Sequence, residues 1–161
     1  MDEYLFRAKR IRDSSWVYGG IMKTFHPNFE HESEETFRKQ KPNCLCICTG
    51  SRDIFVEQRT VGQFIGEYDG TSWEGLTPEE QALFLYPEEG GRRHKEDWRG
   101  RRIFEGDIVE SIVRGNRYVV SFAKCGFFPF AIAGWECVPE PKETRVIGNI
   151  YDNPELVASS K

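Results

Sequence analysis

The sequence predicts a mostly β protein built from short strands. Runs rich in valine, isoleucine and aromatic residues recur at spacings of about 8–12 residues, with glycine, asparagine or proline between them. Aromatic residues make up 14% of the 161 residues, and the clearest helix signals lie in residues 77–86. We therefore expect N-terminal β-hairpins and a C-terminal small (SH3-like) β-barrel or meander, with one short inserted helix and a short C-terminal helical turn.

The N-terminal region, residues 1–66, is predicted to contain two β-hairpins. Tyr4, Phe6 and Ala8 alternate with Leu5, Arg7 and Lys9, which is the two-residue period of a strand. A strand-prone run resumes at residues 16–18 after an Asp-Ser-Ser turn. Residues 44–49 and 54–56 flank a second turn and form the second hairpin.

Two other stretches of this region are less regular. Residues 28–42 are crowded with charge and fit a solvated loop or one short helix starting at Ser33. Residues 60–66 are expected to be extended, with glycines where a side chain would obstruct a turn or a close approach.

Residues 67–101 differ in character and contain the predicted helix. Thr77 can cap the helix, Pro78 suits its first position, and Glu80 completes a capping box. The helix, near residues 78–86, is too short to be stable alone and must pack on something. Its apolar residues pack either on the same chain or on a neighbouring subunit, and the second alternative predicts a homo-oligomer.

The C-terminal region, residues 102–161, is predicted to form the small barrel. A turn at Gly115 and Asn116 joins strands at residues 108–113 and 118–122. Further strands are expected at residues 127–132, 135–138 and 145–151, and a helical turn follows Asn153.

Composition excludes several classes of protein. The net charge is −4, so the chain as a whole carries no signal for nucleic acid or for a membrane surface. The longest nearly apolar run, residues 127–135, is far shorter than the roughly 20 residues of a membrane helix. Five cysteines without a secretion signal indicate free thiols in a reducing cytoplasm.

Three alternating cysteines, Cys44, Cys46 and Cys48, are expected to face the same side of one strand. They are interpreted either as small hydrophobic residues on a buried face or as a metal site completed by Cys125, Cys137 or a histidine. Same-side neighbours on a strand lie roughly 6.6–6.8 Å apart, which suits a tetrahedral zinc ion poorly. We therefore predict no metal and no cofactor.

A basic cluster surrounds one tryptophan near the end of the 67–101 stretch. The candidate ligand-binding residues are Arg92, Arg93, Lys95, Trp98, Arg99 and Arg101, and Arg102 follows them. Such a cluster can bind phosphates while the indole stacks on a base. Alternatively, it is a solvated loop whose charges meet the acids nearby in the sequence, which are Glu88, Glu89, Glu96 and Asp97.

No catalytic constellation is recognised. Glu105 and Asp107 flank Gly106 in what is best interpreted as a structural turn, and no third group points to a reaction. If Gly106 adopts a positive φ, a β-branched residue there is expected to destabilise the protein. Phosphate loops, nucleophile elbows and dinucleotide fingerprints are absent, and the histidines have no metal or triad spacing; they are His26, His31 and His94.

Four motifs, in this order, resemble the YopX family of phage and prophage proteins. They are Phe6-Arg7-Ala8 with Trp16-Val17-Tyr18-Gly19, then Thr60-Val61-Gly62-Gln63-Phe64-Ile65-Gly66, then Ile103-Phe104-Glu105-Gly106-Asp107-Ile108-Val109, and finally Val146-Ile147-Gly148-Asn149-Ile150-Tyr151-Asp152-Asn153-Pro154-Glu155-Leu156. The resemblance implies a phage or prophage origin, a mostly β fold and a cytoplasmic setting, and it carries no catalytic residue onto this chain. Family members pass from the second motif to the third through a short loop, so residues 67–101 are interpreted as an insertion.

Two functional hypotheses follow. The first is a non-enzymatic, homo-oligomeric binding module for a host or phage protein, because small barrels bind through strand edges and aromatic faces. The alternative is a nucleic-acid-binding accessory factor that uses the cluster from Arg92 to Arg102. Neither hypothesis involves a membrane.

Overall fold

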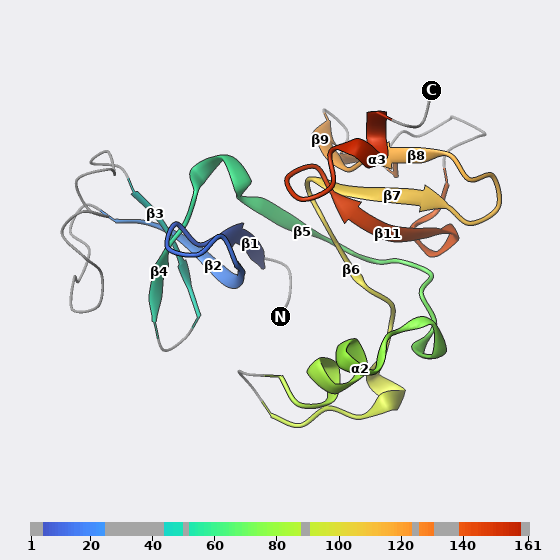
Figure 1. Ribbon diagram of the computed structural model, residues 1–161, viewed down its shortest axis with the longest axis horizontal. Helices are drawn as coiled ribbons and strands as arrows, with labels where there is room; N and C mark the ends of the chain where they lie inside the picture. The colour runs from blue at the N-terminus through green and yellow to red at the C-terminus, as the bar shows by residue number, and fades with distance from the viewer. Residues whose placement is uncertain are drawn as a thin grey trace. The chain divides into compact units, whose positions relative to one another are not determined.

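The chain divides into two compact units, residues 1–65 and 66–161 (Figure 1). The computed structural model describes residues 5–24, 44–49, 52–87, 91–123, 126–130 and 139–158. Most of its regular elements are strands in antiparallel sheets, so the prediction of a mostly β protein is confirmed. The loop or helix expected near Ser33 and the strand expected at residues 135–138 lie outside the described residues. Within them, no helix is long and apolar enough to span a membrane.

The first unit is an antiparallel meander. Its strands are β1 (Phe6–Lys9), β2 (Trp16–Thr24), β3 (Cys44–Cys48), β4 (Asp53–Phe55) and the first residues of β5 (Gly62–Tyr68). Their order is β4-β3-β2-β1-β5, and a 3-10 turn at Gln58–Thr60 precedes β5. Both predicted hairpins, β1–β2 and β3–β4, are therefore confirmed.

The meander curls back on itself. An isolated bridge joins Arg10 to Val56, and the backbone N–H of Glu57 donates to the carbonyl of Lys9 over 2.8 Å. The hydroxyl of Thr60, which is fully buried, accepts from the Lys9 N–H and donates to the Glu57 carbonyl. The residues after β4 are thus hydrogen-bonded to the end of β1. Four buried aliphatic side chains fill the interior of this unit, namely Ala8, Val17, Ile47 and Val56.

Among the described residues, the second unit contains two sheets and two α-helices. Its strands are β6 (Arg102–Phe104), β7 (Asp107–Ser111), β8 (Arg117–Val119), β9 (Ser121–Ala123), β10 (Gly126–Phe128) and β11 (Thr144–Asn149). The helices are α2 (Pro78–Leu85) and α3 (Glu155–Ala158), with 3-10 turns at Trp73–Gly75, Lys95–Asp97 and Pro141–Glu143. Three strands pair in the order β11-β7-β8, β9 pairs with β10, and β6 neighbours the strand β5 that leads into this unit. The small barrel expected over residues 102–161 stays a prediction.

The predicted helix is confirmed at α2. Thr77 Oγ1 accepts from the Glu80 N–H over 3.2 Å, and a Glu80 carboxylate oxygen accepts from the Thr77 N–H over 2.9 Å. This reciprocal pair is the capping box that the sequence indicates. The helix ends at Leu85, two residues before Pro87.

Two strands of the second unit are shorter than predicted. β7 ends at Ser111, whose N–H donates to the Asn116 carbonyl, so Ile112 and Val113 lie in the turn and are exposed. The strand predicted at residues 118–122 is divided at Val120, whose N–H donates to the carbonyl of Asp107 at the start of β7 and whose carbonyl accepts from the Gly106 N–H. A bond within the β7–β8 turn therefore sets the first boundary, and bonds to Gly106 and Asp107 set the second.

The turn between β6 and β7 depends on Gly106. This residue has a φ of +90°, and a Cβ there would lie 3.1 Å from the Tyr151 ring. Its N–H donates to the Val120 carbonyl, and its carbonyl accepts from the Ile150 N–H. The Asp107 carboxylate closes the turn by accepting from the Phe104 N–H over 2.8 Å. The interpretation of this stretch as a structural turn is consistent with these bonds.

Replacing Gly106 with valine is expected to lower the free energy of unfolding by more than about 1 kcal/mol, because β-branched residues resist a positive φ. Urea denaturation of the wild type and Gly106→Val measures the difference. Gly20→Val is the matched control, since Gly20 lies in β2, has no positive φ, and has no atom within 4 Å of an added Cβ. Equal losses in both variants would contradict the expectation.

Candidate functional site

The buried Asp69 carboxylate joins both ends of the predicted insertion. One of its oxygens accepts from the Thr71 N–H (3.0 Å) and the Arg101 N–H (2.7 Å). The other accepts from the Thr71 hydroxyl (2.8 Å) and the Val146 N–H (2.8 Å). The Asp69 N–H also donates to the Arg101 carbonyl. The segment from Thr71 to Arg101, called the excursion below, therefore begins and ends at the Asp69 carboxylate. The same carboxylate is hydrogen-bonded to Val146 of β11.

Three aromatic rings pack together inside this excursion. Trp73, Phe84 and Trp98 meet edge to face, with centroid separations of 5.8 Å, 6.1 Å and 5.1 Å. The Trp98 indole N–H donates to the Thr71 carbonyl over 2.9 Å. Edge-to-face pairs stabilise packing beyond the burial of their surface. The short helix α2 is thus held through Phe84 by rings of its own segment.

Arg101 fixes the start of α2. Its guanidinium donates to both carboxylate oxygens of Glu80, at 3.0 and 3.1 Å, and to the Val146 carbonyl at 3.1 Å. Because Nη2 bonds to Glu80 and Nη1 bonds to Val146, the orientation of the guanidinium is fixed on two sides. Two of the candidate ligand-binding residues, Trp98 and Arg101, therefore use their polar groups in contacts within the protein.

Arg92 and Arg93 lie beside α2 instead. The guanidinium of Arg92 is 5.5 Å from the centroid of the Tyr86 ring, and that of Arg93 is 5.3 Å from the centroid of Phe84. No carboxylate among the described residues pairs with either guanidinium, so that part of the chain does not neutralise their positive charges.

The other two candidate residues are separate from this pair. Lys95 forms an exposed ion pair with Glu74 at 3.4 Å, which contributes little in water. Arg99 is exposed and stacks at 6.0 Å over the ring of Tyr68. The basic cluster of the sequence is thus distributed over several places in the structure.

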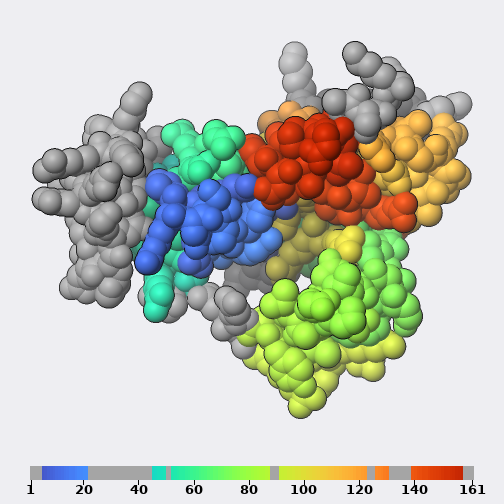
Figure 2. Space-filling model, in the orientation of Figure 1, coloured from blue at the N-terminus to red at the C-terminus, as the bar shows by residue number. Residues whose placement is uncertain are grey.

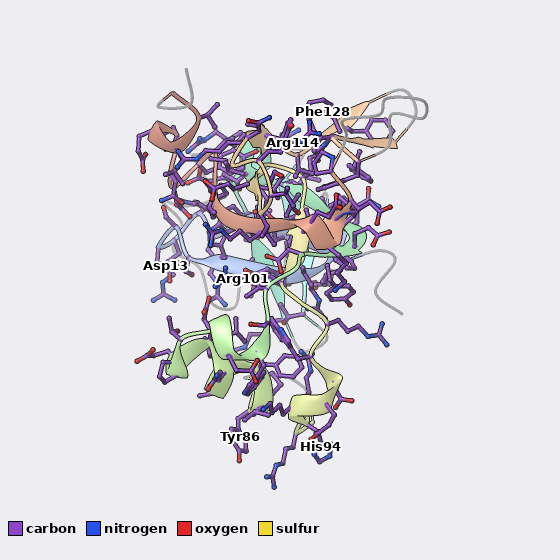
Figure 3. The ribbon with its side chains drawn as sticks, turned by 90° about the vertical axis from the view of Figure 1, so that its right-hand side faces the viewer. Asp13, Tyr86, His94, Arg101, Arg114 and Phe128 are labelled. Atoms are coloured by element: carbon purple, nitrogen blue, oxygen red, sulfur yellow. The ribbon has the colours of Figure 1, made fainter. Side chains whose placement is uncertain are left out.

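Apolar side chains are exposed beside Arg92 and Arg93. Leu83 and Tyr86, at the end of α2, are each 61% exposed. We call Leu83, Tyr86, Arg92 and Arg93 the α2 surface. Figure 2 shows this segment, in green, at the surface of the molecule, and in Figure 3 Tyr86 projects outward at the end of the segment that is remote from Arg101.

Cys46 and Cys48 lie on the face of β3 opposite Leu45 and Ile47, which pack in the interior of the first unit, and the side chain of Cys44 lies outside the described part of the chain. Cys46 is buried, and burial together with the neighbouring Asp53 carboxylate raises the pKa of the Cys48 thiol. A thiol with a raised pKa stays protonated and is a poor nucleophile. No cluster of three metal-ligating side chains occurs among the described residues, and Cys125 and Cys137 lie outside them.

Sequence reasoning missed an ion triad in the second unit. The Glu110 carboxylate on β7 pairs with Arg117 on β8 at 3.1 Å and with Arg145 on β11 at 2.8 Å. Hydrogen bonds from Arg145 and then from Arg117 lower the pKa of Glu110. Arg117 also donates to the Leu156 carbonyl at 2.8 Å, which anchors α3. Only the register of the three strands brings these residues together, so no local sequence pattern predicts the triad.

The fold and this site define a mostly β protein whose second unit carries a pinned helical excursion with exposed aromatic, aliphatic and arginine side chains. A family model described as "YopX protein" matches residues 95–158. This match supports the resemblance to the YopX family over the C-terminal part of the chain, which contains the third and fourth motifs of the resemblance. The first two motifs lie outside the matched residues. No curated protein and no solved structure matches the chain.

Changing Asp69 to asparagine is expected to lower the free energy of unfolding by about 1–3 kcal/mol, because the amide NH₂ would face donors and leave them unpaired. Urea denaturation measures the loss. Asp97→Asn is the control, since its exposed carboxylate accepts one bond, from the His94 N–H. The role given to Asp69 would be wrong if both variants lost the same stability.

The ion triad predicts a pH-dependent effect of Glu110→Gln. A carboxyl with a lowered folded pKa contributes stability above its unfolded pKa, and the contribution disappears as the pH falls through the folded value. Glu110→Gln is therefore expected to be less stable than the wild type at pH 7, with the gap closing well below the ordinary value of 4.5. Thermal unfolding at pH 7 and pH 3 tests this, and a pH-independent gap would contradict it.

Proposed function

We propose that this protein is a non-enzymatic binding module that docks another protein on its α2 surface. The observation that carries the proposal is the exposure of Leu83 and Tyr86, each 61%, in a segment with two arginines that pair with no carboxylate of the described residues. Tyrosine and arginine dominate the energetic centres of protein interfaces. Leucine adds apolar area beside them.

The rigidity of this surface supports the proposal. The Phe84 ring is packed against Trp73 and Trp98, and Glu80 is bound by Arg101, so both ends of α2 are held before any partner arrives. Association costs less when the interface is already ordered. A free loop carrying the same side chains would lose more conformational entropy on binding.

Charge defines the partner that suits this surface. Arg92 and Arg93 are matched by carboxylates on the partner, and Leu83 and Tyr86 are matched by an apolar side chain. With the phage or prophage origin implied by the family, the partner is an acidic host or phage protein in the cytoplasm. A second copy of the chain is the other protein that the same surface can accept.

A photo-crosslinking amino acid at position 83 tests the proposal in cells. We expect a discrete protein adduct from position 83, and its loss when Arg92→Glu and Arg93→Glu are added, because the reversed charges repel an acidic partner. The same probe at position 113 is the control, since Val113 is 79% exposed but lies in the turn after β7. An adduct of two copies would identify self-association.

Two outcomes would overturn the proposal. One is the absence of any protein adduct from position 83. The other is an adduct pattern that is identical from positions 83 and 113 and is unaffected by the arginine changes.

A further inference from the structure

A second cationic site lies at Tyr68 and contains none of the residues of the α2 surface. The guanidinium of Arg99 lies 6.0 Å from the centroid of the Tyr68 ring, and the ammonium of Lys142 lies 5.9 Å from it. Lys142 belongs to the 3-10 turn at Pro141–Glu143, 43 residues from Arg99. The fold of the second unit therefore brings together two cations that the sequence keeps apart.

Lys142 is held in place by the backbone around Asp69. Its ammonium donates to the Asp69 carbonyl at 3.3 Å and to the Arg99 carbonyl. Two of its three N–H groups are thus used, and one remains for a ligand. Gly100, which follows Arg99, has a φ of +118°. A Cβ at this position would lie 2.1 Å from the Asp69 carbonyl oxygen, which is the other acceptor of Lys142. The backbone beside Lys142 therefore leaves no room for a side chain at position 100.

The two positive charges are not neutralised by the described residues. Both side chains belong to exposed residues, and neither Arg99 nor Lys142 pairs with a carboxylate of the described chain. The nearest acid in sequence to Lys142 is Glu143, whose carboxylate accepts from the Glu140 N–H at 3.0 Å. An anionic ligand can therefore interact with both cations.

We propose that Tyr68, Arg99 and Lys142 form a binding site for the phosphates of a single-stranded nucleic acid. Arg99 retains its planar set of N–H donors, which matches phosphate oxygens, and Lys142 adds a fixed point charge. A half-buried ring beside two cations is typical of single-strand binding surfaces, where cations follow the backbone and an aromatic ring contacts a base. A duplex keeps its bases stacked and offers no such ring contact.

Fluorescence anisotropy with labelled oligothymidylate and oligouridylate, at several salt concentrations, tests the site on the full chain. We expect Arg99→Gln with Lys142→Gln to weaken binding about tenfold. The slope of log affinity against log salt should fall by about 1.4, since each phosphate contact on a single strand contributes about 0.7. Arg99→Gln alone, which removes no hydrogen bond within the described chain, should give half of that change in slope.

Arg92→Gln with Arg93→Gln is the matched control, because it removes the same charge from the α2 surface and should change affinity less than threefold. Competition with inorganic phosphate and with a duplex of equal length separates the sources of phosphate. The site is overturned if the wild type does not bind either oligomer at low salt. It is also overturned if both double variants lose affinity equally, or if inorganic phosphate or duplex competes as well as the single strand.

Discussion

The buried carboxylate of Asp69 organises the second unit. Its two oxygens accept four hydrogen bonds from Thr71, Arg101 and Val146, and these bonds replace the water molecules that the carboxylate loses on burial. A buried charge without such partners would be strongly destabilising. Both candidate surfaces depend on this network, because Arg101 reaches from it to the first turn of α2, and Lys142 is placed by the Asp69 carbonyl.

Local chemistry made much of the fold predictable. The capping box at Thr77 and Glu80, the hairpin turn at Gly115 and the alternation through β3 each involve residues that are close in sequence. Asp69 carries no comparable signal, since Asp followed by Gly indicates an ordinary turn. Its decisive partners, Arg101 and Val146, are 32 and 77 residues away. Contacts at that separation follow from the assembled sheet.

Contacts between residues distant in sequence also explain why the candidate site was only partly predictable. Proximity in sequence suggested one basic patch, but Arg93 stacks on Phe84, Arg99 stacks on Tyr68, and Arg101 binds Glu80. Lys142 joins Arg99 only through the fold, just as Glu110 meets its arginines only through strand register. The exposure of Leu83 was not predictable either, because it depends on which side of α2 the tryptophans occupy.

The hydrogen bonds between Asp69 and Arg101 form a closed neck at the base of the excursion. This neck affects how the sequence of such a protein can change in evolution. When both ends of a segment meet, its length can change at little thermodynamic cost, about 0.6 kcal/mol for each doubling. Descendants could exchange the whole excursion for another without disturbing β6 or β11. For a protein engineer, the neck is a grafting point at which foreign loops can be displayed.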